Sequence, residues 1–263
     1  MEVPVHELGH GTPFRSRKLN SFFNKVFCFI SWSNGVHYHT SHRMHHLYTC
    51  NQGIDYEIVL TPMKKNSVWV FYRFIFDLEK FIHRMKPNIM HVFGSTKADF
   101  FHWNELFSRD DPRREKMILW SRLTCLGHGL LIAAFIYTQQ YILILIVNFP
   151  TFFATWLMHG CGMLQHEGLN PKAQDWRENT YSFRTGPLIG YLYWQMQYHL
   201  EHHTYAAVPF YNLKKLHRLM APHAPAPLRG YFSGLMHLYK IMLRQNKDPS
   251  YYYIPELPAL ERT

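Results

Sequence analysis

Residues 141–160 have the sequence YILILIVNFPTFFATWLMHG, twenty consecutive residues without a charged side chain. An α-helix of about 20 residues spans the hydrocarbon core of a bilayer, which is about 30 Å thick. The stretch before it, 118–137, has the sequence ILWSRLTCLGHGLLIAAFIY and is nearly as apolar, and only Thr138, Gln139 and Gln140 separate the two. The pair predicts a transmembrane helical hairpin. Two buried helices of a soluble core are the alternative.

Basic residues lie on both sides of the predicted hairpin, whereas its turn is uncharged. Because cytoplasmic loops of membrane proteins are enriched in Lys and Arg, both ends are expected on the cytoplasmic side. The net charge of +10 includes basic residues interleaved with aromatic ones, as in residues 67–93. That pattern is typical of an interfacial helix on an anionic membrane surface. No nucleic-acid-binding motif accompanies it, so a nucleic-acid partner is not expected.

The predicted fold class is an all-α membrane protein, in which a transmembrane hairpin joins interfacial helices and a cytosolic, histidine-rich cap. One domain is expected over residues 1–217, because all the histidine motifs lie there. Prolines recur after Ala221, which predicts a C-terminal cap or tail over residues 218–263. The four cysteines have no spacing typical of a zinc site and are expected to be reduced thiols.

Many of the nineteen histidines fall into four short motifs: HELGH, HRMHH, LQHEGLN and HLEHH. The residues concerned are His6, His10, His42, His45, His46, His166, His199, His202 and His203. Residues at i, i+3 and i+4 share one face of a helix, so each motif is expected to direct its imidazoles at one spot. Neutral imidazole binds iron, copper, nickel or zinc. Eight or nine imidazoles exceed the needs of one tetrahedral ion, and they suit two ions held side by side.

HELGH also matches the His-Glu-x-x-His signature of zinc metallopeptidases, in which the glutamate is the general base. This alternative would make Glu7 catalytic. It would leave both His-x-x-His-His motifs without a role, so the interpretation based on two metal ions is favoured.

The ordered motifs HELGHGT, SHRMHH followed by DYE, QHEGL and YWQMQYHLEHHTYAAVPFYNLKKLH resemble the membrane fatty acid desaturase family. The likeness runs from His6 to about His217 and is closest to the bacterial rhizobitoxine- and rhizopine-type branch. It implies a helical membrane fold with a di-iron centre, whose ligands would be the nine histidines named above. By the same resemblance, four polar residues would orient those ligands through hydrogen bonds: Asp55, Glu57, Asp175 and Arg177.

The resemblance implies oxygen-dependent desaturation of a fatty acyl chain in lipid metabolism, catalysed by an integral membrane oxidoreductase. The cofactors would be two iron ions. The sequence has no dinucleotide fingerprint and no haem-binding module, so the electrons are expected from a separate ferredoxin- or cytochrome-type donor. A di-iron hydroxylase of an alkane, carotenoid or sterol is one alternative. A non-catalytic membrane protein with a structural metal site is another.

The resembled family has a further membrane hairpin before its first histidine motif, whereas here His6 follows shortly after Met1. The expectation is therefore a fragment or truncated gene product, with His6 and His10 in an unanchored helical turn that frays, so that this chain alone would be inactive. A genuinely shortened enzyme that borrows the missing helices from a partner is the alternative.

Overall fold

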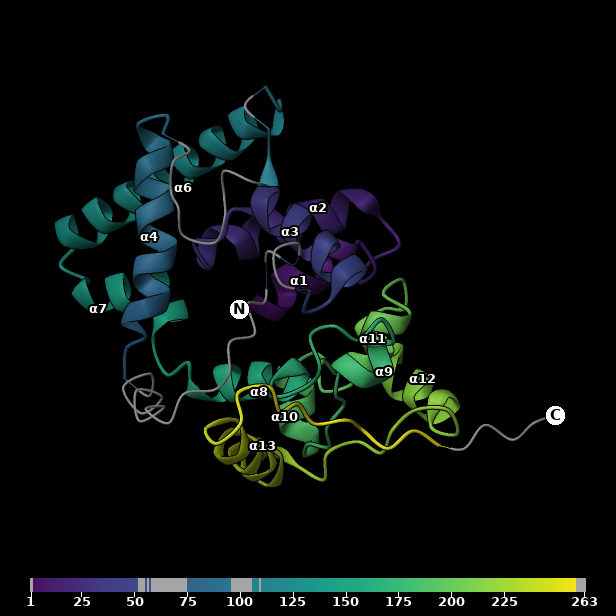
Figure 1. Cartoon of the computed structure of the whole chain (residues 1–263). Coiled ribbons are helices and arrows are strands. Elements are labelled where there is room, and N and C mark those ends of the chain that lie inside the picture. The colour runs from purple at the N-terminus through teal and green to yellow at the C-terminus, as the bar shows by residue number, and fades with distance from the viewer. Residues whose placement is uncertain are drawn as a thin grey trace. The chain divides into compact units, whose positions relative to one another are not determined.

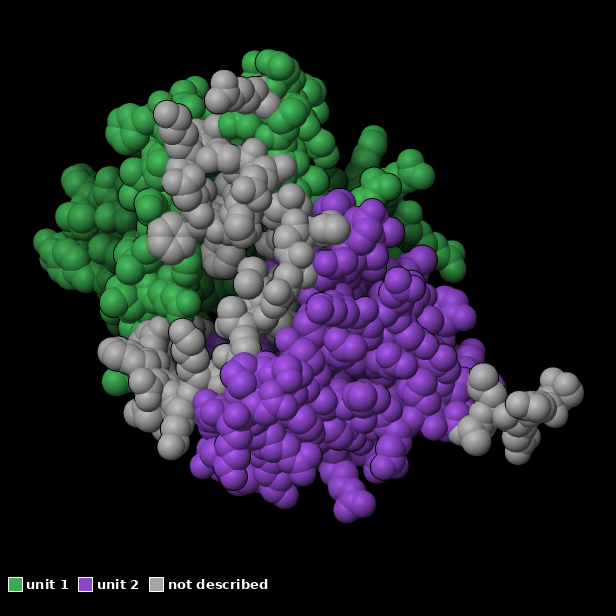
Figure 2. Space-filling view, viewed as in Figure 1, with its two compact units in different colours: residues 1–43, 70–155 green, residues 44–69, 156–263 purple. Residues whose placement is uncertain are grey.

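Figure 1 shows a computed structural model of the chain, which describes residues 2–51, 55, 57, 75–95, 106–108 and 110–258. Every regular element in these residues is a helix, and β pairing among them is limited to isolated bridges. The all-α class predicted from the sequence is confirmed. The chain divides into two compact units (Figure 2): unit 1 contains residues 1–43 and 70–155, and unit 2 contains residues 44–69 and 156–263.

Unit 1 is built from the N-terminal and middle parts of the chain. Its elements are α1 (Glu2–His10), α2 (Arg17–Ile30), the first part of α3 (Gly35–Tyr48), α4 (Leu78–Val92), α6 (Arg113–Tyr137), α7 (Tyr141–Leu143), the π-helix η3 (Ile144–Asn148) and the 3-10 helix η4 (Pro150–Phe152). α1 packs on α2, and α4 packs along α6. The interfacial helix predicted over 67–93 coincides in its second half with α4, while residues 67–74 lie outside the described residues.

The helix that carries HELGH is anchored, which corrects the expectation of a fraying turn. The Asn24 side-chain amide donates a hydrogen bond to the carbonyl of Val5 at 3.1 Å, and the Asn20 amide donates to the carbonyl of Gly11 at 2.8 Å. Val5 is buried, as are most residues of α1. Side-chain amides of α2 therefore hold α1 at its middle and just beyond its last residue.

α6 contains the first predicted membrane segment and begins five residues earlier, at Arg113. Among the described residues it is the one helix whose length and mean hydropathy fit a membrane crossing, and 17% of its most apolar window is buried. Its exposed apolar side chains are Leu119, Leu123, Leu126, Leu130, Ile136 and Tyr137. The predicted turn follows, with Gln139 at φ +57°.

The second predicted membrane helix, 141–160, is not continuous in the structure. α7, η3 and η4 follow one another, the chain leaves helical geometry after η4, and α8 begins at Trp156. Pro150 explains the break, because it has no N–H and disfavours helical geometry at the residue before it. Asn148 is buried beside the break and donates to Nδ1 and the carbonyl oxygen of His128 at 2.9 and 3.2 Å. These bonds satisfy the buried side-chain amide of Asn148 and join the interrupted segment to α6.

Unit 2 contains the end of α3 and most of the C-terminal half of the chain. Its further elements are α8 (Trp156–His166), α9 (Trp176–Asn179), α10 (Pro187–Leu192), α11 (His199–Thr204), the 3-10 helix η5 (Phe210–Asn212), α12 (Leu213–Met220) and α13 (Tyr231–Gln245). α13, within the predicted C-terminal range 218–263, packs on α8. Glycine permits this close approach, because a Cβ at Gly234 would lie 2.6 Å from a side-chain carbon of Leu164.

Candidate metal centre

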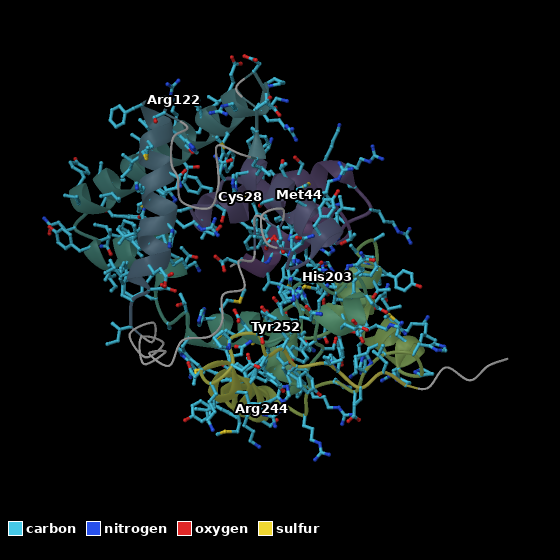
Figure 3. All side chains as sticks on the ribbon, viewed as in Figure 1. Cys28, Met44, Arg122, His203, Arg244 and Tyr252 are labelled. Atoms are coloured by element: carbon cyan, nitrogen blue, oxygen red, sulfur yellow. The ribbon has the colours of Figure 1, made fainter. Side chains whose placement is uncertain are left out.

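Four histidines from three helices of unit 2 form a buried cluster. His45 comes from α3, His166 ends α8, and His199 and His203 lie one turn apart on α11. All four are between 1% and 3% exposed, and one ring nitrogen from each lies within 4.8 Å of the others. His203 is labelled in Figure 3. We call these four residues the histidine quartet.

The quartet's Nε2 atoms face one another. Nε2 of His199 lies 3.0 Å from Nε2 of His166 and 3.1 Å from Nε2 of His203. The His45 ring meets the rings of His166 and His203 edge-on, with centroids 5.0 and 4.8 Å apart. Imidazole nitrogens about 2.0–2.1 Å from a shared metal ion lie about this close to one another. The arrangement can therefore hold a metal ion.

Polar groups hold the Nδ1 atoms of the quartet. Nδ1 of His45 donates to the Asp55 carboxylate at 2.7 Å, and Nδ1 of His166 donates to the carbonyl of Asn179 at 2.8 Å. The Thr49 hydroxyl lies 3.1 Å from Nδ1 of His203. Metal-binding histidines characteristically use their second nitrogen in this way, which fixes the ring and leaves the other nitrogen for the metal.

The partner of Nδ1 in His199, the fourth histidine of the quartet, is Gln165. The side-chain amide of Gln165 lies 3.2 Å from Nδ1 of His199 and donates to the hydroxyl of Tyr193 at 2.9 Å. All four rings of the quartet thus have one nitrogen engaged and Nε2 directed inward. This orientation is the observation that fits metal binding best.

Burial favours the neutral form of two of these imidazoles, those of His166 and His203. It lowers the pKa of His166 to about 3 and lowers the pKa of His203 well below its ordinary value. Burial also opposes the charged form of His45, but the hydrogen bond from its ring to Asp55 outweighs it and raises the pKa of His45. Neutral imidazole is the form that binds metal ions.

The other predicted ligands form two smaller groups, one in each unit. In unit 1, Nε2 of His10 lies 2.9 Å from Nε2 of His42, and the ring of His6 lies 4.2 Å from that of His42. In unit 2, Nε2 of His202 lies 3.1 Å from Nε2 of His46. Each group brings together histidines from different helices, so both offer further nitrogen atoms for metal binding.

The His-x-x-His-His motifs do not direct all their imidazoles at one spot. On α11, His199 and His203 point into the quartet, whereas His202 pairs with His46. Successive helical residues are about 100° apart, so the adjacent histidines of such a motif diverge. The expectation of one spot for each motif is corrected, because each motif divides its histidines between groups.

The four polar residues predicted to orient the ligands behave differently from one another. Asp55 contacts His45 directly, and it also accepts from the backbone N–H of Glu57 at 2.9 Å. Asp175 and Arg177 form an ion pair at 2.6 Å, and Asp175 caps α9. Both lie at the start of α9, whose last residue, Asn179, provides the carbonyl that binds His166.

Glu7, the glutamate of HELGH, is fully buried in α1. Its carboxylate lies 3.4 Å from Nδ1 of His6, its neighbour in the chain. HELGH thus contributes His6 and His10 to a cluster with His42, while the quartet in unit 2 uses none of its residues. The metallopeptidase interpretation accounts for neither the quartet nor its hydrogen bonds.

Several residues of this region were missed in the sequence. Thr49 lies four residues after His45, one helical turn away, so its position carried a signal. Gln165 and Asn179 carried none, because only the packing of α8, α9 and α11 brings them to the quartet. Buried imidazole clusters on helices, oriented by such bonds, characterise a class of helical metalloproteins.

A sequence model of the family described as fatty acid desaturase matches residues 1–234. The chain therefore belongs to the fatty acid desaturase family, as the ordered histidine motifs predicted. A search of curated proteins and a search of solved structures returned no match. Membership supports an oxidoreductase of fatty acid metabolism and a membrane-associated protein.

Proposed function

We propose that this chain catalyses oxygen-dependent desaturation of a fatty acyl chain, using two iron ions held by the nine histidines of the four motifs. The orientation of the histidine quartet is the observation that carries the proposal. Four buried imidazoles with engaged Nδ1 atoms form a donor set that suits iron. His6, His10 and His42 of unit 1, and His46 and His202 of unit 2, are the other candidate ligands.

The overall reaction takes two hydrogen atoms from adjacent carbons. One alkyl –CH2–CH2– unit, one dioxygen molecule, two electrons and two protons give one –CH=CH– unit and two water molecules. The iron pair supplies the reduction of dioxygen and the removal of hydrogen from an unactivated C–H bond. The protein's residues hold the ligands and exclude water, since the quartet is almost entirely buried.

The electrons come from a separate ferredoxin- or cytochrome-type protein in this proposal. The chain carries 28 Lys and Arg residues against 18 Asp and Glu residues. A surface with this balance attracts an acidic redox partner and accelerates their encounter. In the same proposal, the protein lies in the membrane with its histidine motifs on the cytoplasmic side. Within the family, it belongs to the rhizobitoxine- and rhizopine-type branch.

In this proposal the chain crosses the membrane twice, at residues 118–137 and at residues 141–160. α6 supplies the first, and the second is interrupted at η3 and η4. Interrupted helices persist within membranes where neighbouring groups satisfy the freed backbone polar atoms, often with local π or 3-10 geometry. The indole of Trp32 does this by donating to the carbonyl of Asn148 at 2.6 Å.

Expression in a host followed by mass spectrometry of its lipids tests the reaction. We expect acyl chains lighter by two hydrogen atoms, and their loss in a His45→Ala variant. Hydroxylated alkanes, carotenoids or sterols in place of unsaturated acyl chains would assign the hydroxylase alternative instead. Peptidase activity that depends on Glu7, with one zinc and no iron, would overturn the proposal.

A further inference from the structure

The last histidine motif, HLEHH, contains a carboxylate that is fully buried. Glu201 is 0% exposed, and both of its carboxylate oxygens accept short hydrogen bonds. Oε2 accepts from the hydroxyl of Ser182 at 2.5 Å, and Oε1 accepts from Nδ1 of His217 at 2.5 Å. A buried carboxylate is costly unless it is bonded in this manner. The two bonds tie α11 to α12 and to the segment that follows α9.

The same two partners also hold the start of α11. The Ser182 oxygen accepts from the backbone N–H of Leu200 at 3.2 Å, which occupies an N–H of the first helical turn. The ring of His217 packs on that of Tyr198, the residue before α11, with centroids 4.8 Å apart. Ser182, Glu201 and His217 therefore form one network, which we call the Glu201 network.

α11 needs support from outside because it is short. It has six residues, three of them histidines of the proposed centre, and Tyr198 provides no side-chain cap. Helices this short are not stable by themselves, and metal sites lose function when ligands depart by about 0.5 Å or 10–20° from their geometry. The Glu201 network fixes both the start and the middle of the helix.

We infer that the Glu201 network positions His199, His202 and His203 for metal binding, with His217 and Ser182 as positioning residues. This inference rests on the proposed function. It assigns a role to His217, which has no motif spacing in the sequence and belongs neither to the quartet nor to the two smaller histidine groups.

The test compares three full-length variants in detergent. His217→Leu removes the donor to Glu201, whereas His217→Asn keeps an N–H near the position of Nδ1. His223→Leu is the control, because it makes the same change at an exposed histidine in the turn after α12. Binding of Fe²⁺ and of Co²⁺ is titrated, and the ligand-field absorption of the Co²⁺ form reports the ligand geometry. Thermal unfolding is measured for each variant.

We expect His217→Leu to weaken metal binding about tenfold or more and to alter the Co²⁺ spectrum, as loss of a group that orients ligands does. His217→Asn should recover most of the affinity and the wild-type spectrum, and His223→Leu should match the wild type. In turnover, His217→Leu should lower kcat with little change in KM. If His217→Leu does not fold, Ser182→Ala removes the other bond to Glu201 and should change the spectrum in the same direction.

Wild-type affinity and an unchanged Co²⁺ spectrum in folded His217→Leu would overturn the positioning role and leave the proposed function standing. Failure of the wild-type chain to bind either ion would overturn the proposed function and the role of the network with it.

Discussion

Nδ1 of His45 donates a hydrogen bond to the Asp55 carboxylate at 2.7 Å, and both side chains are buried. Asp55 also accepts from the backbone N–H of Cys50 at 2.8 Å, so its carboxylate bridges His45 and the backbone just after α3. The carboxylate orients the ring and strengthens its Nε2 as a metal ligand.

Asp55→Asn should therefore weaken binding of Fe²⁺ or Co²⁺ by about 10–100-fold while leaving the chain folded. Isothermal titration of the purified protein measures the affinity. Asp248→Asn is the matched control, because Asp248 is exposed and its carboxylate accepts from the backbone N–H and the hydroxyl of Ser250. Equal affinities in the two variants would show that Asp55 does not orient a ligand.

His203→Ala should reduce the bound iron, because it removes one nitrogen of the quartet together with the partner of the Thr49 hydroxyl. Iron content per chain, measured by plasma emission spectrometry, should fall by about one ion if the two ions bind independently. His223→Ala, at an exposed position, should retain the wild-type content. Full iron content in His203→Ala would remove this residue from the ligand set.

Gly160→Ala should destabilise the packing of α13 on α8, because a Cβ at residue 160 would collide with the side chain of Tyr231. Overpacking of this kind costs about 1–3 kcal/mol, which lowers Tm by roughly 2–4 °C per kcal/mol in a chain of this size. Differential scanning fluorimetry in detergent measures the change. The second substitution Tyr231→Leu should restore part of the loss, whereas additive losses would place the two residues apart.

A cysteine at position 139 should react with a membrane-impermeant maleimide only from the non-cytoplasmic side, since Gln139 lies in the turn after α6. Position 114, before the apolar part of α6, should react only from the cytoplasm. Cys125, the native cysteine that is not fully buried, is first replaced by serine. Labelling of position 139 from the cytoplasm alone would exclude the two-crossing hairpin.

The chain's helices were predictable where local patterns specify them. The apolar run at 118–137 appears within α6, and the turn appears at Thr138–Gln140. Pro150 lies in the quoted stretch and is a local signal for the interruption of the second segment. The prediction of a continuous helix gave more weight to the hydrophobicity of the stretch. The group that satisfies the backbone at the interruption was not local, because the carbonyl of Asn148 accepts from the indole of Trp32, more than a hundred residues earlier.

The sequence by itself determined the family, the nine histidines and their grouping into helical motifs, because i, i+3 and i+4 spacing is a property of a single helix. Which histidines meet was decided by the tertiary structure. His45 and His46 are neighbours in the chain, yet only His45 joins the quartet, while His46 pairs with His202. The partners Gln165 and Asn179 became visible only in the fold. Their hydrogen bonds depend on how separate helices pack, whereas helix periodicity identifies the face of a helix that packs and not the residues of another helix that it meets.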